Sequence, residues 1–262
     1  MRISVGQFRP TGVAAENVAT MERLARQARD DGAGLILFPE ESMFTVRHVA
    51  GSFAESVDAG WSSFVRDLTR IAADLQIAIV AGGYEPSGTD RPFNTLVAVD
   101  ATGRIMDKYR KMHLYDAFKY KESDRITPGV RDLSIVEIGG LRFGMMTCYD
   151  LRFPEVARAL AVGGADVLLV PAAWFAGDHK VDHWQTLLKA RAVENTVWVV
   201  AADTRSDTTI GHSTIVDPLA IPVASLTEEG EAIATADVTR ERIDEVRSFL
   251  PVLANRRTDI LG

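Results

Sequence analysis

The chain has 262 residues, of which 47% are hydrophobic and 25% are charged, a composition typical of a globular protein with enough apolar material for a core. Its formal net charge of −7 and its pI near 5.3 argue against nucleic-acid and anionic-membrane partners, because no basic block interrupts the mixed charges. The single cysteine excludes an intramolecular disulfide and a zinc site built from cysteines.

The beginning of the chain and its apolar runs predict where the protein resides. Residues 1–7 continue directly into strand-like sequence and lack the long apolar core of a signal peptide. The most apolar stretches, residues 167–170 and 197–202, are far shorter than a membrane span. We therefore expect a cytoplasmic protein without a membrane partner.

Strand-like and helix-like segments alternate through the first half of the chain. Apolar residues at helical spacing predict a helix around Val18 to Ala28, and a continuous apolar stripe predicts a second from Trp61 to Leu75. A turn at residues 100–103 joins the last two strands of this half. The predicted strands are residues 3–8, 35–38, 77–82, 95–99 and 104–109.

The second half repeats this alternation. Gly139-Gly140 predicts a hairpin turn between two strands, and Pro154 begins a helix that ends at Gly163-Gly164. Another helix is expected around Val181 to Ala192. The predicted strands are residues 133–138, 141–147, 167–170, 197–202, 213–217, 222–226 and 232–237.

This order of elements predicts an α/β fold in one domain, residues 1–262, because no linker or low-complexity stretch interrupts the chain. Two sheets packed face to face, with helices outside, would bury every apolar stripe. A doubly wound single sheet is the competing architecture, and composition does not separate the two.

Cys148 is the first candidate for chemistry. A lone cysteine is usually a small buried hydrophobe. Here, however, the strand that ends at residue 147 is followed by Tyr149 and Asp150 and then by a helix that begins at Pro154. A nucleophile at such a strand-to-helix turn lies at the sheet edge, near backbone amides that can stabilise an oxyanion.

Three charged residues gain meaning only in combination. Glu40 follows a buried strand, Lys111 lies in a basic stretch, and Glu122 has lysine neighbours; each alone is typical of a solvated surface. In order, however, the segments Phe-Pro-Glu, Tyr-Arg-Lys-x-His-Leu and Cys-Tyr-Asp-x-Arg-Phe-Pro-Glu resemble the three signatures of the carbon–nitrogen hydrolase (nitrilase) superfamily. The resemblance extends over nearly the whole chain, through Pro128-Gly129, residues 189–195, residues 211–213 and the closing Arg256-Arg257-x-Asp259.

The resemblance implies a four-layer α-β-β-α sandwich and a cysteine-dependent hydrolase. At the matching positions, Cys148 is the nucleophile, Glu40 the general base and Lys111 the oxyanion stabiliser. Glu122 matches a second glutamate found near the site in many members. These residue types suit the reaction, because a weakly ionised thiol needs a base and the tetrahedral intermediate needs a positive charge. No metal or organic cofactor is required.

The histidines suggest a rival mechanism. His179 and His183 are spaced i, i+4 near a helix start and have aspartate neighbours, which is a spacing that can hold one metal ion. The glutamate of a His-Glu-x-x-His protease is absent, so we expect Asp178 or Asp182 to cap the helix instead. His113 and His212 are expected to be structural.

The residues around Cys148 narrow the subfamily. They resemble ω-amidases and deaminated-glutathione amidases, which cleave a terminal or glutamine-like amide from small acids. An N-carbamoyl amide hydrolase, a nitrile hydrolase of the same fold and a non-catalytic scaffold remain alternatives. The expected partners are a small-molecule substrate and further copies of the chain, in a homodimer or larger assembly. The expected substrate-binding residues are Tyr149, Arg152, Trp174 and Phe44, with Arg152 pairing either with a substrate carboxylate or with Asp150 or Glu155.

Overall fold

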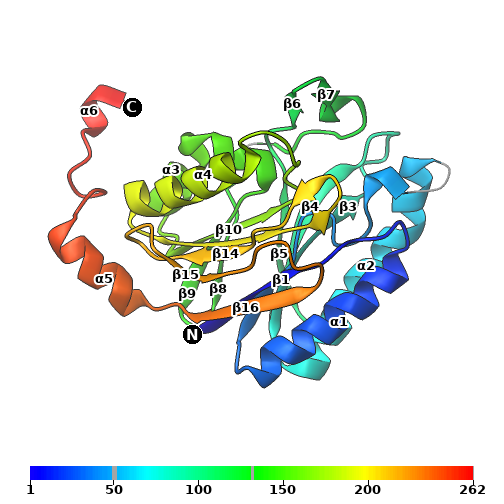
Figure 1. The fold of residues 1–262 in the computed structure, drawn as a ribbon, viewed down its shortest axis with the longest axis horizontal. Coiled ribbons are helices and arrows are strands. Elements are labelled where there is room, and N and C mark those ends of the chain that lie inside the picture. The colour runs from blue at the N-terminus through cyan, green and yellow to red at the C-terminus, as the bar shows by residue number, and fades with distance from the viewer. Residues whose placement is uncertain (49–51, 131–132, 262) are drawn as a thin grey trace.

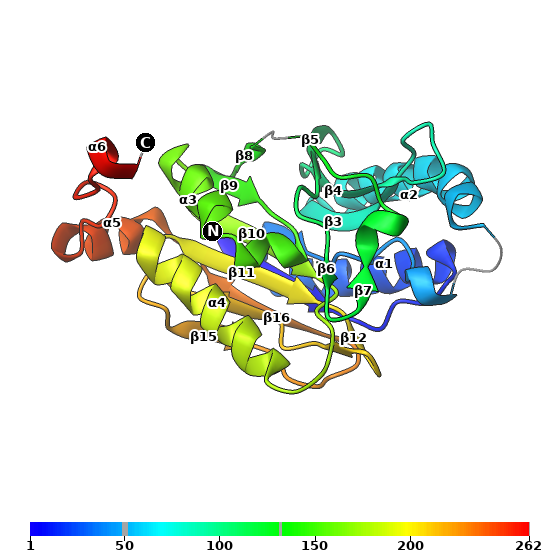
Figure 2. The ribbon, with the colours of Figure 1, turned by 90° about the horizontal axis from the view of Figure 1, so that it is seen from above.

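Two sheets packed face to face form the centre of the molecule, in a computed structural model that describes residues 1–48, 52–130 and 133–261. Helices α1 (Ala14–Asp30) and α2 (Phe53–Leu75) cover the outer face of one sheet, and α3 (Pro154–Val162) and α4 (Lys180–Asn195) cover that of the other (Figures 1 and 2). The four-layer α-β-β-α prediction is confirmed. The doubly wound single sheet is wrong.

The first sheet has six strands in the order β16-β1-β2-β3-β4-β5. Its three central strands, β1 to β3, run parallel, and the flanking strands pair antiparallel. Consequently the carboxyl ends of β1 to β3 lie at one edge of the sheet. The bounds are β1 (Arg2–Gln7), β2 (Leu35–Leu37), β3 (Ala78–Glu85), β4 (Phe93–Val99), β5 (Ile105–Arg110) and β16 (Ala232–Asp237).

The second sheet has the order β15-β14-β11-β10-β9-β8, with β9, β10 and β11 parallel. Its strands are β8 (Ile135–Ile138), β9 (Leu141–Met145), β10 (Val167–Ala172), β11 (Trp198–Asp203), β14 (Thr214–Val216) and β15 (Pro222–Ser225). Two small hairpins complete the strands: β6 (Asp116–Ala117) with β7 (Tyr120–Lys121), and β12 (Arg205–Ser206) with β13 (Thr209–Ile210).

The alternation of side chains along the strands explains the layers. In β2, Leu35 and Leu37 face the second sheet, whereas Ile36 faces α1 and α2. In β10, Leu169 points between the sheets and Leu168 points toward α3 and α4. Because successive residues of a strand point to opposite faces, an all-apolar strand is buried on both sides.

Several boundaries differ from the predictions. Helix α2 begins at Phe53, well before Trp61, because the Ser52 side chain caps it by accepting a hydrogen bond from the Glu55 N–H. The hairpin turn is as predicted: Gly139 and Gly140 have φ values of 56° and 80°, which two-residue hairpins favour and which glycine adopts without strain. Strand β8 begins only at Ile135.

The chain ends in a helical segment that the sequence did not predict, α5 (Arg240–Phe249) and α6 (Thr258–Leu261). It lies at one end of the sandwich in both ribbon views, and α5 bonds to the rest of the molecule through Arg242 and Asp217 (Figures 1 and 2). Only Ile243 and Val246 of α5 are buried, and Phe249 has 59% of its surface exposed.

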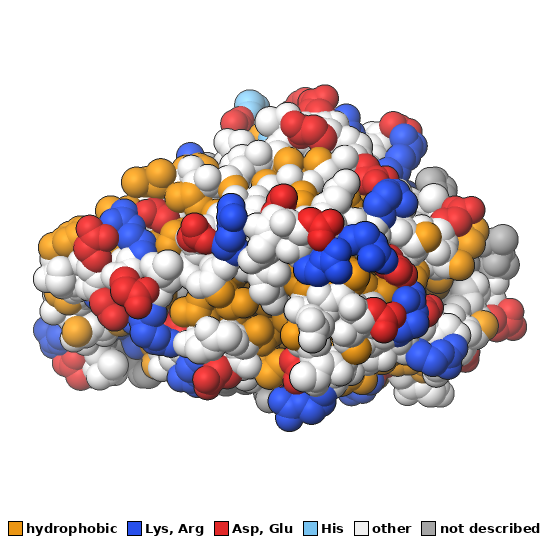
Figure 3. Space-filling view, turned by 90° about the horizontal axis from the view of Figure 1, so that it is seen from below, with side chains coloured by type: hydrophobic (Ala, Val, Ile, Leu, Met, Phe, Trp, Pro, Cys, Tyr) orange, Lys and Arg blue, Asp and Glu red, His pale blue; other side chains and the backbone are white. Residues whose placement is uncertain are grey.

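The outer surface carries mixed charges. In the face drawn in Figure 3, Lys and Arg side chains lie next to Asp and Glu side chains. Within the described ranges, no helix has both the length and the apolarity needed to cross a membrane. The loops that the structure describes contain the short 3₁₀ helices η1 (Val46–His48), η2 (Glu122–Asp124) and η3 (Cys148–Arg152).

Candidate active site

The loops that leave the central strands of both sheets meet at one edge of the sandwich. Glu40 follows β2, Cys148 follows β9 and Ala173 follows β10. The Glu40 loop passes directly against β3 at Gly82. A Cβ atom at Gly82 would lie 2.1 Å from the Glu40 carbonyl oxygen, so only glycine permits this approach.

Cys148 lies at a strained turn between β9 and α3. Its φ is +47°, in the left-handed region that residues other than glycine rarely adopt. The turn is held by Asp150, whose Oδ2 accepts a hydrogen bond of 2.9 Å from the Thr147 N–H. Such strain concentrates at functional sites and persists only where the surroundings enforce it. The predicted strand-to-helix turn therefore exists, with η3 between the strand and the helix.

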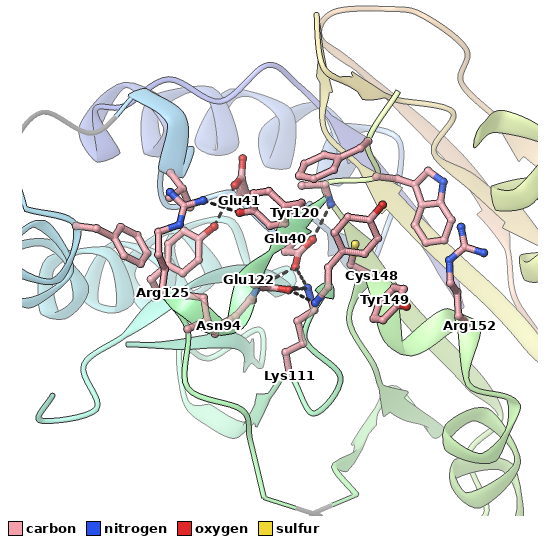
Figure 4. A pocket seen from close by; sticks show the side chains of 18 of the residues that line it. Glu40, Glu41, Asn94, Lys111, Tyr120, Glu122, Arg125, Cys148, Tyr149 and Arg152 are labelled. Carbon is pink, nitrogen blue, oxygen red and sulfur yellow. Dashed lines mark hydrogen bonds and ion pairs between the residues drawn. The ribbon is translucent and has the colours of Figure 1, made fainter. Parts of the chain in front are cut away.

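Lys111 joins two carboxylates in the interior. Its Nζ donates to Glu40 Oε1 at 2.8 Å and to both Glu122 oxygens, at 3.1 and 2.9 Å (Figure 4). All three side chains are nearly inaccessible to solvent. Glu122 thus pairs with Lys111 and not with its sequence neighbour Lys121, which pairs with Asp124.

Three further groups fix the two carboxylates in place. The Asn94 Nδ2 donates to Glu40 Oε1 at 2.7 Å and to Glu122 Oε1 at 3.3 Å. The Ala173 N–H donates to Glu40 Oε2 at 2.8 Å, and the Tyr115 N–H donates to Glu122 Oε2 at 2.6 Å. Each carboxylate is therefore oriented by several donors, which reduces the motion of the oxygens that face Cys148.

The charges of the site set the protonation of Cys148 and Lys111. Burial, followed by the Glu40 charge, raises the pKa of the Cys148 thiol well above its usual value, against the opposing effect of Lys111. Burial lowers the pKa of Lys111, but Glu122 and Glu40 outweigh it, so this pKa is raised well above normal. The site thus holds a neutral thiol beside an ammonium and two carboxylates, an arrangement suited to proton transfer during thiol attack.

These residues line a cleft with an empty volume of about 610 Å³, open solvent at its mouth included. Tyr149, Arg152 and Trp174, expected at the substrate, all line it. Phe44 does not: it is buried and packs against Phe53 and Tyr84, which themselves form part of the wall. The expectation that Phe44 contacts the substrate is therefore corrected, because the loop turns its ring into the core.

Comparison with known proteins places this site in a family. The family model described as carbon-nitrogen hydrolase matches residues 2–248. The chain belongs to the carbon–nitrogen hydrolase family. Among its curated relatives, a deaminated glutathione amidase of Escherichia coli O157:H7 is 39% identical over 257 residues, covering 98% of this chain and 97% of that protein. An omega-amidase of Xenopus tropicalis is 29% identical, covering 99% and 96% of the two chains. These relatives confirm the predicted subfamily resemblance.

The solved structures include a mutant amidase of Nesterenkonia sp. AN1 with the acetamide moiety of fluoroacetamide added covalently at its active-site cysteine. It is 28% identical to this carbon–nitrogen hydrolase, with a TM-score of 0.84, and the match covers 100% of this chain and 95% of that one.

Sequence reasoning missed several residues that line the cleft of this hydrolase. Asn94 lies within β4, and its strand-like surroundings carry no sign of a polar function. Lys180 is the first residue of α4, and Tyr115 and Arg125 lie on either side of the β6–β7 hairpin. Glu41, the residue after Glu40, accepts a hydrogen bond from the Tyr84 hydroxyl at 3.1 Å, and burial raises its pKa.

His179 and His183, the two candidates for a metal site, contact other side chains instead. His183 Nδ1 lies 3.4 Å from Arg152 Nη2, and His179 lies 3.5 Å from Asp182. Among the described residues, no group of three or more His, Cys, Asp or Glu side chains could hold a metal ion. The expected aspartate cap is wrong: His179 occupies the N-cap of α4, without a side-chain cap bond.

Proposed function

We propose that this protein is a cysteine-dependent amidase that hydrolyses the terminal amide of a small carboxylic acid and releases ammonia. The observation that supports this most strongly is the bonding of Lys111 to both Glu40 and Glu122 beside the strained Cys148. A buried ammonium held between two carboxylates has little structural benefit, because burying charges costs several kcal/mol of desolvation each. Its value lies in chemistry.

In the first half of the reaction, the Cys148 sulfur attacks the amide carbon while Glu40 takes the thiol proton. The raised pKa of Cys148 makes this base necessary, because little thiolate exists before attack. The oxyanion forms next to the Lys111 ammonium and the backbone N–H of Tyr149. One such donor typically lowers the barrier by about 3 kcal/mol.

In the second half, Glu40 returns the proton to the departing nitrogen, so that ammonia leaves and a thioester with Cys148 remains. Glu40 then takes a proton from water, whose oxygen attacks the thioester carbon. The carbon–sulfur bond breaks, the thiolate regains a proton from Glu40, and the free acid leaves. Glu122 accepts hydrogen bonds from Lys111 and raises its pKa, which keeps the ammonium charged and oriented through both halves.

The contacts of Arg152 favour a substrate that carries a carboxylate over a neutral one. It lines the cleft, and its guanidinium contacts the Trp174 ring and His183 rather than Asp150 or Glu155. The structural pairing that competed with substrate binding is therefore not formed. A planar guanidinium can bind both oxygens of a carboxylate.

We also propose that the protein assembles as a homodimer or a larger homo-oligomer. The C-terminal segment lies at one end of the sandwich, and the exposed Phe249 ring at the end of α5 would otherwise remain in water. Contact with a second copy would bury this segment.

A hydrolysis panel tests the proposed activity. Ammonia release is measured with ω-amides of dicarboxylic acids, N-carbamoyl amino acids and nitriles, for the native protein and for Cys148→Ala. We expect the ω-amides to be hydrolysed fastest and Cys148→Ala to be inactive. A faster reaction with carbamoyl compounds or nitriles, or activity in Cys148→Ala, would contradict the proposal. Chelators should leave the rate unchanged.

A further inference from the structure

Two cations, Arg152 and Lys180, lie at the same end of the cleft, and the sequence analysis identified only Arg152 as a substrate-binding residue. Arg152 and Arg125 lie at opposite ends of the cleft, with Glu40, Lys111 and Cys148 between them (Figure 4). Lys180, the first residue of α4, also lines the cleft, and it is 8% exposed. The two charges are close enough to interact, because the Arg152 charge lowers the pKa of Lys180.

Trp174 connects the two cations. The guanidinium of Arg152 lies over the Trp174 ring, 4.9 Å from its centroid. The indole N–H of Trp174 donates to the Lys180 carbonyl oxygen at 3.0 Å, which fixes the start of α4 beside the same ring. One buried side chain thus contacts the Arg152 guanidinium and the backbone of Lys180.

Neutral groups hold both side chains. Lys180 Nζ donates to the Tyr115 hydroxyl at 3.1 Å and lies 3.9 Å from the Phe118 ring centroid. Arg152 Nη2 approaches His183 Nδ1, and its Nε is buried without a hydrogen-bond partner. Within residues 1–48, 52–130 and 133–261, no carboxylate oxygen pairs with either cation at 4.0 Å or less.

Two like charges without a counter-ion, one buried and one partly buried, are unfavourable, since burial removes water and the cations repel each other. Burial, followed by the Arg152 charge, accordingly lowers the pKa of Lys180. An arrangement of this kind is stabilised when an anion enters between the cations. The hydrogen bonds of Lys180 and Arg152 to that anion would be charge-assisted, which makes them stronger than the neutral contacts they replace.

We propose that Lys180 and Arg152 together form a two-cation subsite for the carboxylate of the substrate's acyl part, and that Lys180 is the residue that sets the preference for acidic over neutral amides. The proposal rests on the amidase function above and names its substrate class: monoamides of short dicarboxylic acids. Arg152 lies four residues after Cys148 in η3, an axial rise of about 8 Å at about 2 Å per residue, which a short acyl chain can bridge.

The experiment compares substrates that differ in one charge. Succinamate and glutaramate are the acidic amides, and butyramide and valeramide are their uncharged partners of equal chain length. The ratio of kcat/KM for the acidic amide to that for its partner is measured in the native protein, Lys180→Met and Lys180→Arg. Lys189→Met removes a charge from the same helix outside the cleft, and Arg125→Met removes one from the opposite end.

We expect Lys180→Met to lower this ratio by about 10-fold or more, the scale of one charge-assisted hydrogen bond. Lys180→Arg should restore most of it, and Lys189→Met should leave it unchanged. A ratio that falls equally in Lys180→Met and Lys189→Met, or that falls only in Arg125→Met, would overturn the subsite.

A binding measurement separates this proposal from the proposed function. Succinate and glutarate should protect Cys148 from alkylation by iodoacetamide, and Lys180→Met should raise the concentration needed by about 10-fold. If the native protein hydrolyses none of the amides yet shows this shift, the amidase function fails and the anion subsite stands. If the amides are hydrolysed and Lys180→Met shifts neither protection nor the kcat/KM ratio, the subsite fails and the amidase function stands.

Discussion

The hydroxyl of Tyr109 donates a hydrogen bond of 2.7 Å to Oδ2 of Asp150, and this bond ties β5, which leads to Lys111, to the turn that carries Cys148. On the other oxygen of the same carboxylate, the N–H and Nδ1 of His113 lie at 3.0 and 2.7 Å. Asp150 is fully buried, so it acts as an internal clamp between the two segments of the site.

Replacing this clamp should affect catalysis as well as stability. In Asp150→Asn, an amide NH₂ would face groups that donate to a carboxylate oxygen. We expect a loss of about 2 kcal/mol in the free energy of unfolding, the cost of leaving buried donors unsatisfied, and a fall in kcat of about 10-fold or more. Urea denaturation and amide turnover measure the two effects. Tyr109→Phe should lose less stability and less kcat. Asp58→Asn, on the exposed face of α2, should change neither quantity. Unchanged kcat in a destabilised Asp150→Asn would limit Asp150 to a structural role.

Glu40→Gln should separate thiol ionisation from turnover. The Glu40 charge is second to burial among the causes that raise the pKa of Cys148, whereas Lys111 lowers it. Removing the carboxylate charge therefore lowers this pKa, and the midpoint of the pH profile for iodoacetamide alkylation of Cys148 should move to lower pH. Amide turnover should nevertheless fall by at least about 100-fold, because the general base is lost. An alkylation midpoint that moves to higher pH would contradict the charge assignment.

Lys111→Met should make stability depend on pH in a defined direction. Without the ammonium, the buried carboxylates of Glu40 and Glu122 repel each other, and uptake of a proton relieves this repulsion. Stability that depends on such a proton is present at low pH and is lost as the pH rises. The variant should be destabilised by about 3 kcal/mol or more at pH 8 and by less at pH 5.

Urea unfolding of Lys111→Met at several pH values tests this pH dependence of stability. The double variant Lys111→Met/Glu122→Gln is measured for comparison. The second substitution removes one of the two opposed charges and should recover part of the stability at pH 8. Turnover should fall at least about 100-fold in both variants, since the oxyanion donor is missing. Equal destabilisation at pH 5 and pH 8 would argue against a charge effect.

Arg152→Lys tests the geometry of the guanidinium rather than its charge. A lysine retains the charge but cannot bind both oxygens of a carboxylate. We expect a higher KM for acidic ω-amides and little change for neutral amides of similar size. If Arg152 has a structural role instead, the KM values of both substrate classes should rise alike and the melting temperature should fall.

The oligomeric state can be tested at Phe249. Light scattering of the native protein at micromolar concentration should report a dimer or larger assembly. Phe249→Asp should shift the population toward monomer, because it places a charge on an apolar contact of the C-terminal segment. The matched control is Val13→Asp, a comparably exposed apolar position before α1, which should leave the mass unchanged. A native protein that is monomeric would contradict the assembly.

Much of the framework follows from local sequence. The uninterrupted apolar runs in strands such as β2 and β10 predict burial on both faces, and the helical stripe of α2 predicts the layer outside. The strand-to-helix turn at Cys148 and the three charged motifs are visible as strings of residues, so the nucleophile and its neighbours in the site could be nominated without coordinates.

What depends on non-local packing could not be obtained in this way. Glu122 pairs with Lys111 and not with its neighbour Lys121, because β5 and η2 lie side by side and bring Lys111 to Glu122. Asn94 became part of the site because β4 pairs with β3 in a particular register, and Lys180 because the Trp174 indole holds the start of α4 at the cleft. Residue patterns report the period of one element, whereas the contacts of a site depend on the relative placement of several, and only the packing of two sheets and their helices sets that placement.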